Sequence, residues 1–252
     1  MKFIKKIENE INERYNININ LLDIIKIDLI NFKCQFPLYK LLFRIKSPKE
    51  IYIINSSDNQ YIVDAAKKLG IIVNELQHGL ISDYDVICNF PNTEPDSLEY
   101  FPDRFFIWNN IDMCFGSLPL SKKNIIYFKN EHLDKWVRKT ENIDKEFKTI
   151  LIISQPNSSI EMVQFMEKNI PEMGDYIFLY KIHPAENILV INMYKEKLEK
   201  KYHNVKFINN EEPIYLLLKK SEFVIGIFSS ALFEATLFNC KIILLDLPGV
   251  EM

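Results

Sequence analysis

The chain has 252 residues, a length that suits one large domain or two small ones. Apolar residues make up 48% of it and glycine and proline are few, at 6 and 11, which excludes fibrous, repetitive and disordered chains. The 31 Lys and Arg residues are balanced by 34 Asp and Glu residues, for a formal charge of −3. Because no overall positive field is present, the composition argues against nucleic-acid binding.

The cysteines and the hydropathy pattern indicate the compartment. The four cysteines are widely spaced and form neither a C-x-x-C pair nor a metal-ligand pattern with a histidine, so we expect reduced cysteines that serve packing. No apolar run approaches the roughly 20 residues that cross a bilayer, and the first residues lead into a charged helical stretch in place of a signal peptide's apolar core. We therefore expect a cytoplasmic protein.

The first 50 residues are predicted to be helical, because apolar residues recur at spacings of three and four, as at Ile7 and Ile11. Basic residues alternate with apolar ones across this segment. A solvated helix face on the core is the simpler interpretation of this alternation, and peripheral contact with the inner membrane face is the alternative.

An α/β pattern begins after Pro48. Apolar strands are predicted at 51–55, 71–76, 104–108 and 124–128. A helix at 59–70 joins the first two strands, and a Pro- and Asn-rich loop at 89–102 precedes the third. We expect residues 1–145 to form an abbreviated N-terminal acceptor-side α/β domain with a helical preface.

Strands and helices alternate regularly after the charged run 131–147. Predicted strands lie at 149–154, 176–182, 205–208, 223–228 and 241–247, and predicted helices at 158–170, 188–201, 212–219 and 230–238. This alternation is typical of a doubly wound, mostly parallel sheet. We expect residues 146–252 to form a Rossmann-like domain that binds the nucleotide.

Ligands of open α/β sheets bind at the carboxyl ends of strands, so polar residues just after predicted strands are the candidate site residues. Six residues of the second half suit a nucleotide: Lys181, His183, Pro184, Ser229, Ser230 and Glu234. Pro184 holds His183 at a strand end, and the two serines begin a helix whose free N–H groups attract anions. Glu234 lies one turn further on, where it can accept a ribose hydroxyl. A loop-ordering histidine and an ordinary serine N-cap are the alternatives.

A second polar cluster follows the strand 71–76. Gly79 permits a tight turn, which leaves Gln77 and His78 at the strand end, facing the expected cleft and acceptor. His78 is a candidate general base, with the carboxylates of Glu75 and Asp83 as alternatives that the residues alone do not rank. No P-loop, dinucleotide fingerprint, nucleophile elbow or H-E-x-x-H motif is present, so those enzyme classes lack support.

Three motifs in order point to a family. QHG (77–79), KIHP (181–184) and GIFSSALFEA (226–235), the last followed by ILLDLPG, resemble the motifs of bacterial GT-B glycosyltransferases that make capsules and lipopolysaccharide. The sequence is most similar to those that use CMP-activated sugars. The resemblance implies two Rossmann-like domains with parallel sheets facing a cleft. In that family the HP and Ser-Ser motifs bind the CMP moiety, which implies nucleotide contacts for His183, Ser229 and Ser230.

The resemblance implies a glycosyltransferase that moves sialic acid or a Kdo-like sugar from a CMP-linked donor to a surface polysaccharide or lipooligosaccharide. No metal is required in this interpretation, because no Asp-x-Asp motif is present and a helix start supplies positive potential. The same motifs are also similar to those of CDP-glycerol and related polyol-phosphate transferases. A non-catalytic nucleotide-sugar-binding homologue is a third interpretation. The expected partners are the donor and a glycan or glycolipid acceptor, and homo-oligomerisation stays open.

Overall fold

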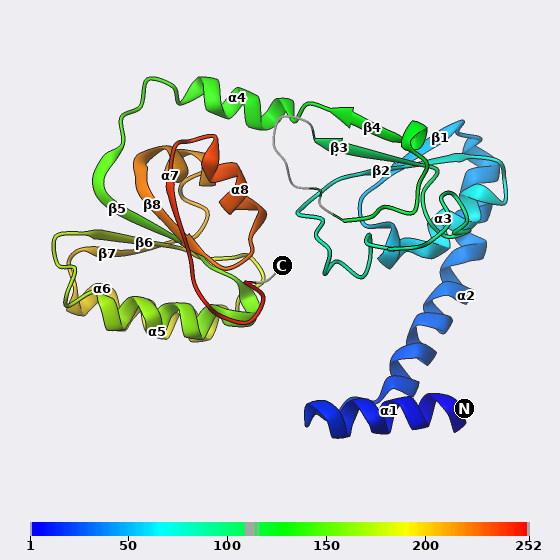
Figure 1. The fold of residues 1–252 in the computed structure, drawn as a ribbon, viewed down its shortest axis with the longest axis horizontal. Helices are drawn as coiled ribbons and strands as arrows, with labels where there is room; N and C mark the ends of the chain where they lie inside the picture. The colour runs from blue at the N-terminus through cyan, green and yellow to red at the C-terminus, as the bar shows by residue number, and fades with distance from the viewer. Residues whose placement is uncertain (1, 109–113, 115, 251–252) are drawn as a thin grey trace. The chain divides into compact units, whose positions relative to one another are not determined.

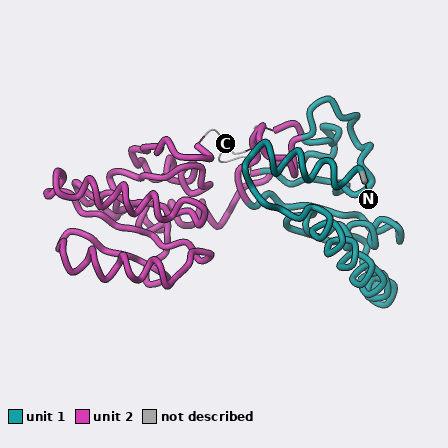
Figure 2. The backbone as a smooth tube through the Cα atoms, turned by 90° about the horizontal axis from the view of Figure 1, so that it is seen from below, with its two compact units in different colours: residues 1–78, 90–107, 118–126 teal, residues 79–89, 108–117, 127–252 magenta. Residues whose placement is uncertain are grey.

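The computed structural model describes residues 2–108, 114 and 116–250. The chain falls into two compact units, coloured separately in Figure 2. The first unit comprises Met1–His78, Phe90–Ile107 and Leu118–Ile126, and the second comprises Gly79–Asn89, Trp108–Ser117 and Tyr127–Met252. The main segment of the second unit therefore begins before residue 145, where the sequence predicted the boundary.

Three helices and a four-stranded sheet come first along the chain (Figure 1). They are α1 (Lys2–Tyr15), α2 (Leu21–Lys46), β1 (Glu50–Ile53), the 3-10 turn η1 (Ser56–Asn59), α3 (Gln60–Lys67), β2 (Ile72–Leu76), β3 (Arg104–Trp108), the 3-10 turn η2 (Lys122–Asn124) and β4 (Ile125–Phe128). The strand order is β1-β2-β3-β4, and β2 pairs in parallel with both β1 and β3. The predicted helical preface and strand-helix-strand unit are confirmed.

The core of the first unit lies where α2 and α3 pack on the sheet. Val63 and Ala66 of α3 are fully buried, and Phe43 of α2 joins the same cluster as Val73 of β2. Gly70 then ends the helical segment with a left-handed backbone, φ 71°, which glycine adopts without a steric cost. The residues buried between these helices and the sheet are the apolar ones whose spacing predicted the helix and the strands.

The second unit carries a five-stranded parallel sheet and five helices. Its elements are α4 (Glu131–Lys139), β5 (Glu146–Ile153), the 3-10 turn η3 (Pro156–Ser158), α5 (Ser159–Asn169), β6 (Ile177–Lys181), α6 (Ile188–Lys201), β7 (Val205–Ile208), α7 (Ile214–Lys220), β8 (Ser221–Gly226), α8 (Ser230–Thr236) and β9 (Lys241–Leu244). The strand order is β7-β6-β5-β8-β9, and every neighbouring pair is parallel. This order confirms the predicted doubly wound sheet.

Helices cover both faces of this sheet (Figure 1). Ile152 of β5 packs with Met162 of α5 on one face, whereas Leu151 packs with Leu218 of α7 on the other. Because residues 150–153 of β5 are buried on both faces, they form a continuous apolar run, not an alternating one. The helix α4 also joins this core through the fully buried Leu133, although its charged sequence did not predict a packed element.

The strand order marks one edge of this sheet as the place for a candidate site. The chain leaves β5 toward β6 on one side, and later returns to β8 on the other side of β5. Loops that leave adjacent strands in opposite directions open a crevice at the carboxyl ends, which is where open α/β sheets bind ligands. The residues that follow β5, β6 and β8 are therefore the candidate site residues of this unit.

Candidate functional site

A buried carboxylate anchors the loop after β6. The backbone N–H of His183 donates to the Glu186 Oε2 at 2.7 Å and to the Ser154 Oγ at 2.8 Å. Ser154 Oγ and the Tyr180 hydroxyl also donate to Glu186, both at 3.0 Å. Burial and this carboxylate raise the pKa of Tyr180, which stays a donor. The network ties the His183 loop to the loop after β5, beside the switch point of the sheet.

This network was not predicted from the sequence, although part of its signal is present there. Glu186 follows His183 by three residues, a spacing that lets a side chain return to a loop N–H. Ser154 directly follows an apolar strand. Tyr180 lies inside a strand and carried no signal of its own, because nothing in its sequence context distinguishes a bonded hydroxyl from an ordinary core aromatic.

The imidazole of His183 lies exposed at the sheet edge, and its orientation is set locally. Its Nδ1 accepts the backbone N–H of Ala185 at 3.1 Å. A neutral ring whose Nδ1 is an acceptor carries its proton on Nε2, so this ring presents an N–H donor. Pro184, also exposed, contributes no N–H to the loop. The arrangement suits a hydrogen bond to an anionic oxygen.

Lys181, the last residue of β6, is half-buried. Burial lowers the pKa of its ammonium group, and the nearby Glu211 carboxylate partly opposes that effect. Glu211 is itself held by the backbone N–H of Asn209 at 2.7 Å. The Glu211 carboxylate, in the loop after β7, therefore balances part of the positive charge that was predicted for this edge.

The two serines after β8 begin α8. Ser229 is the N-cap, and its Oγ accepts the backbone N–H of Ala231 at 3.3 Å, so the N-cap alternative is realised. Ser230 is the first residue of the helix, and both serines are partly exposed. A Cβ at Gly226 would lie 2.9 Å from the Leu232 Cδ2, so the glycine lets α8 pack closely on the end of β8.

Glu234 is buried inside the start of this helix, at 8% exposure. Its carboxyl shares a hydrogen bond with the Tyr215 hydroxyl of α7, and burial raises its pKa to about 7. Burial and the same contact raise the pKa of Tyr215 to about 12. The residue predicted to accept a ribose hydroxyl thus already has a protein partner.

At the end of β2, Glu75 is nearly inaccessible, at 1% exposure. Its Oε1 accepts the Ser56 backbone N–H at 3.2 Å, and its Oε2 has no hydrogen-bond partner among the described residues. Burial raises the pKa of this carboxyl, although Ser56 and the nearby His78 act in the opposite direction. Glu75 therefore holds the turn that follows β1 and does not reach solvent.

The other predicted residues after β2 differ in exposure. Gln77 is buried and its backbone N–H donates to the Phe106 carbonyl at 2.9 Å, whereas His78 is exposed. Gly79 does not have a left-handed backbone, and a Cβ there would meet open space, so this turn does not depend on glycine. Asp83 is exposed, and its backbone carbonyl accepts the Asn89 side-chain amide. Gln77 and His78 belong to the first unit, and the other two belong to the second.

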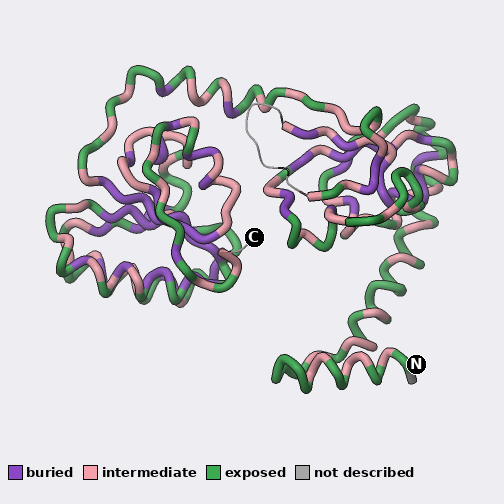
Figure 3. Tube along the Cα trace, in the orientation of Figure 1, coloured by how far each residue is buried: buried purple, intermediate pink, exposed green. Residues whose placement is uncertain are grey.

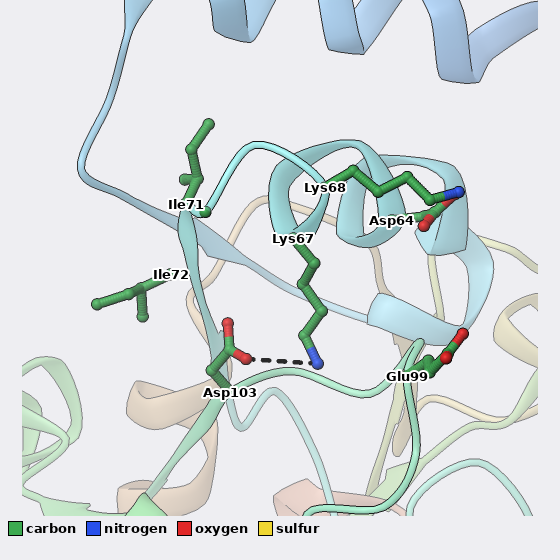
Figure 4. A pocket seen from close by; sticks show the side chains of 8 residues that line it. Asp64, Lys67, Lys68, Ile71, Ile72, Glu99 and Asp103 are labelled. Atoms are coloured by element: carbon green, nitrogen blue, oxygen red, sulfur yellow. Dashed lines mark hydrogen bonds and ion pairs between the residues drawn. The ribbon is translucent and has the colours of Figure 1, made fainter.

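Several cavities lie in the first unit. One, of about 540 Å³, lies at the amino end of β2, where Lys67 pairs with Asp103 at 3.4 Å and Lys68 with Asp64 at 2.9 Å (Figure 4). Because these charges neutralise one another at the end of the sheet that does not usually bind ligands, we assign this cavity no function.

The second cavity, of about 580 Å³, adjoins η1 at the carboxyl end of β1. Its lining combines two aromatic rings with amides, carboxylates and a hydroxyl: Asp28, Asn31, Phe32, Gln35, Ser57, Asp58, Gln60 and Tyr61. The sequence does not predict this groove, because half of its lining comes from α2 and half from the segment after β1.

Within the described residues, no group of three or more His, Cys, Asp and Glu side chains is arranged to hold a metal ion, and no helix is long and apolar enough to cross a membrane. All four cysteines are free. Cys34 is exposed on α2, which corrects the expectation that every cysteine serves packing.

Comparisons with known proteins identify the fold. No family model and no curated protein matches the sequence. A UDP-N-acetylglucosamine 2-epimerase structure from Rickettsia bellii matches 84% of this chain and 60% of its own, at a TM-score of 0.55 and 13% identity. The UDP-GlcNAc 2-epimerase from Neisseria meningitidis bound to UDP-GlcNAc matches 86% of this chain and 64% of its own, at a TM-score of 0.53 and 15% identity. The pneumococcal O-GlcNAc transferase GtfA matches 83% of this chain and 44% of its own, at a TM-score of 0.48 and 11% identity.

This chain spans less than two thirds of the length of these three structures. At such low identity the likeness concerns the fold, and the two parallel sheets with their helices agree with it. The predicted fold class is therefore confirmed: the chain has the GT-B-like α/β architecture, with two Rossmann-type sheets, that is found in nucleotide-sugar enzymes.

Proposed function

We propose that this protein is a glycosyltransferase that takes a sugar from a nucleotide-activated donor, with the nucleotide at the carboxyl edge of the β5–β9 sheet. The observation that carries this proposal is the exposed His183 ring, held beside the switch point by the buried Glu186. An oriented neutral N–H donor at that place suits a phosphate oxygen.

The proposed donor contacts follow from the residues at this edge. His183 and the hydroxyls of Ser229 and Ser230 bind the donor phosphate, with charge from Lys181 and a rigid loop from Pro184. Glu234 accepts a ribose hydroxyl, which requires it to exchange its Tyr215 contact for the ligand. The motif resemblance favours a CMP-linked sialic acid or Kdo-like donor. The UDP-GlcNAc in the Neisseria structure makes a uridine donor the competing candidate.

The proposed reaction is substitution at the anomeric carbon of the donor sugar. The acceptor hydroxyl oxygen forms the new bond, the bond from the sugar to the phosphate oxygen breaks, and the hydroxyl proton passes to the base. His78 is our first choice for that base and Asp83 the second, because both are exposed. Glu75, buried under η1, positions the loop. The charge of the leaving phosphate is stabilised by His183 and the serine hydroxyls.

The acceptor is proposed to be a surface polysaccharide or lipooligosaccharide, and we assign its sugar to the groove of about 580 Å³ beside η1. Apolar ring faces from Phe32 and Tyr61 together with the amides of Asn31 and Gln35 combine stacking surface with hydrogen-bonding groups. This assignment rests on the chemistry of the lining.

A second candidate function is 2-epimerisation of a UDP-sugar. The epimerase structures have TM-scores of 0.53 and 0.55, higher than that of the transferase GtfA at 0.48. Product analysis separates these functions, because an epimerase converts its substrate without an acceptor. Transfer of a polyol phosphate from CDP-glycerol is separated from sugar transfer by the same analysis.

The first test is thermal unfolding with CMP, CDP, UDP and GDP in parallel. A ligand at 100 times its dissociation constant stabilises the folded state by about 2.7 kcal/mol, enough for a clear rise in melting temperature. We expect a selective rise with the cytidine nucleotides that is lost in His183→Ala and retained in His203→Ala, an exposed histidine in the turn before β7. A selective response to UDP would assign a uridine-linked donor, and no response to any of the four nucleotides would contradict nucleotide binding at this edge.

A further inference from the structure

The helix α2 has two apolar faces. On one face Phe43 and Phe36 pack in the core of the first unit, and Phe32 stacks on Phe36. A second stripe runs along the opposite side at Ile27, Ile30, Cys34, Leu38, Leu41 and Ile45, again spaced by three or four residues.

Counted along the chain, Phe32, Phe36 and Phe43 are four and seven residues apart. This spacing puts them on one face of the helix. Phe43 is 8% exposed and belongs to the core of the first unit, against which Phe36 packs. One face of α2 is therefore committed to the fold.

The stripe on the opposite side is exposed to solvent. Leu38 is 62% exposed and Ile45 is 69% exposed, and the other large apolar side chains of the stripe are more than half exposed. Figure 3 shows α2 as exposed or intermediate along nearly its whole length. Single exposed apolar residues are ordinary on protein surfaces, but a continuous row along one helix face marks an interaction surface.

The charge beside this stripe is one-sided. Over the length of the stripe, residues 27–46 carry four cations, Lys33, Lys40, Arg44 and Lys46, and one carboxylate, Asp28, in a chain whose overall formal charge is −3. Lys33, Lys40 and Arg44 are seven and four residues apart, so they lie along one flank of the stripe. A row of cations beside an apolar row is the pattern of a helix that lies on an anionic lipid surface.

We propose that α2 docks this protein on an anionic membrane surface, with the stripe inserted among the lipid chains and the flanking cations at the lipid phosphates. The charge argues for lipid over a second copy of this chain, because pairing two such helices would bring like charges together. Long basic side chains can hold their charges at the headgroups while their stems follow the apolar stripe. The proposal does not depend on the enzymatic function.

The test is cosedimentation of the full chain with vesicles of phosphatidylcholine and phosphatidylglycerol, and with vesicles of phosphatidylcholine alone. We expect binding to the mixed vesicles that weakens as salt is added. The double variant Leu38→Ser with Ile45→Ser should bind about 100-fold more weakly, at about tenfold for each apolar side chain. The matched control is Leu189→Ser with Met193→Ser on α6, where the side chains are 75% and 70% exposed.

A charge variant tests the other half of the proposal. Lys33→Gln with Arg44→Gln should weaken binding about 25-fold, because each cation near an anionic surface contributes about fivefold. Lys168→Gln with Lys200→Gln, two exposed lysines of the second unit, changes the net charge equally and should leave binding as it was. Equal loss in both charge variants would overturn the proposal, because it would indicate attraction without a specific surface.

Cys34 offers a measurement that does not depend on substitutions. It lies within the stripe and is the exposed member of the four free cysteines. A polarity-sensitive fluorophore on Cys34 should shift to the blue when the mixed vesicles are added, because the label enters the acyl region. An unchanged spectrum with bound protein, absence of binding to the mixed vesicles, or self-association through the stripe in place of vesicle binding would each overturn the proposal.

Discussion

The Glu186 carboxylate accepts the backbone N–H of His183 at 2.7 Å from beneath the loop that follows β6. The same oxygen accepts the Ser154 hydroxyl from the loop after β5, so one buried group joins two neighbouring loops at the sheet edge. Backbone geometry at the candidate nucleotide site is thereby set by a residue that is itself 9% exposed.

Removal of this carboxylate should loosen the loop and destabilise the protein. Glu186→Ala leaves the donors of Ser154, Tyr180 and His183 without their acceptor, at a cost of about 2–4 kcal/mol. Urea unfolding measures this loss, and nucleotide-induced stabilisation should fall with it. Glu196→Ala, an exposed glutamate of α6, is the control and should stay within about 0.5 kcal/mol of the wild type. Wild-type stability in Glu186→Ala would contradict the role assigned to the network.

Glu234 should make stability depend on pH. Its pKa in the folded protein is about 7, against an ordinary value of 4.5, so folding takes up a proton between these values. The free energy of unfolding should therefore fall as pH rises through this window, by about 3 kcal/mol, and stay level above it. Glu234→Gln removes the ionisable group, so its free energy of unfolding should not show this part of the decrease with pH. Identical pH profiles of unfolding for the two proteins would show that Glu234 is not buried as described.

Gly226 should be intolerant of a side chain. Its added Cβ would lie 2.9 Å from the Leu232 Cδ2, and Leu232 is buried at the start of α8, so Gly226→Ala should cost about 1–3 kcal/mol. Gly174→Ala is the matched control, because a Cβ there meets no atom within 4 Å. Differential scanning calorimetry of the two variants makes the comparison. Equal melting temperatures would mean that α8 does not pack on β8 as described.

The base of the proposed transfer can be identified by substitution. His78→Gln should lower turnover by about 100-fold or more while nucleotide binding is unchanged, because the exposed imidazole is proposed to act on the acceptor and not on the nucleotide. Asp83→Asn should then retain turnover. The opposite result would assign the base to Asp83. Full turnover in both variants would remove both from the mechanism.

Much of the fold could be predicted because the apolar residues carry it directly. Residues 150–153 of β5 and 223–225 of β8 are apolar and mostly β-branched, as strand segments covered on both faces must be, and the polar residues after these strands lie at the carboxyl end of the sheet. The helix α4 was missed because its apolar residues, Leu133 and Trp136 among them, are few within a charged segment. Its packing depends on a sheet formed later in the chain.

By itself, the sequence determined the strand and helix pattern, the fold class and the positions of His183, Ser229 and Ser230 at strand ends, because these follow from local periodicity. Only the tertiary structure decided which polar groups are buried together. Glu186 meets the loop after β5, and Glu234 meets Tyr215, across contacts between elements distant in sequence. Burial and partnership are properties of the packed molecule, and local patterns of residues do not contain them.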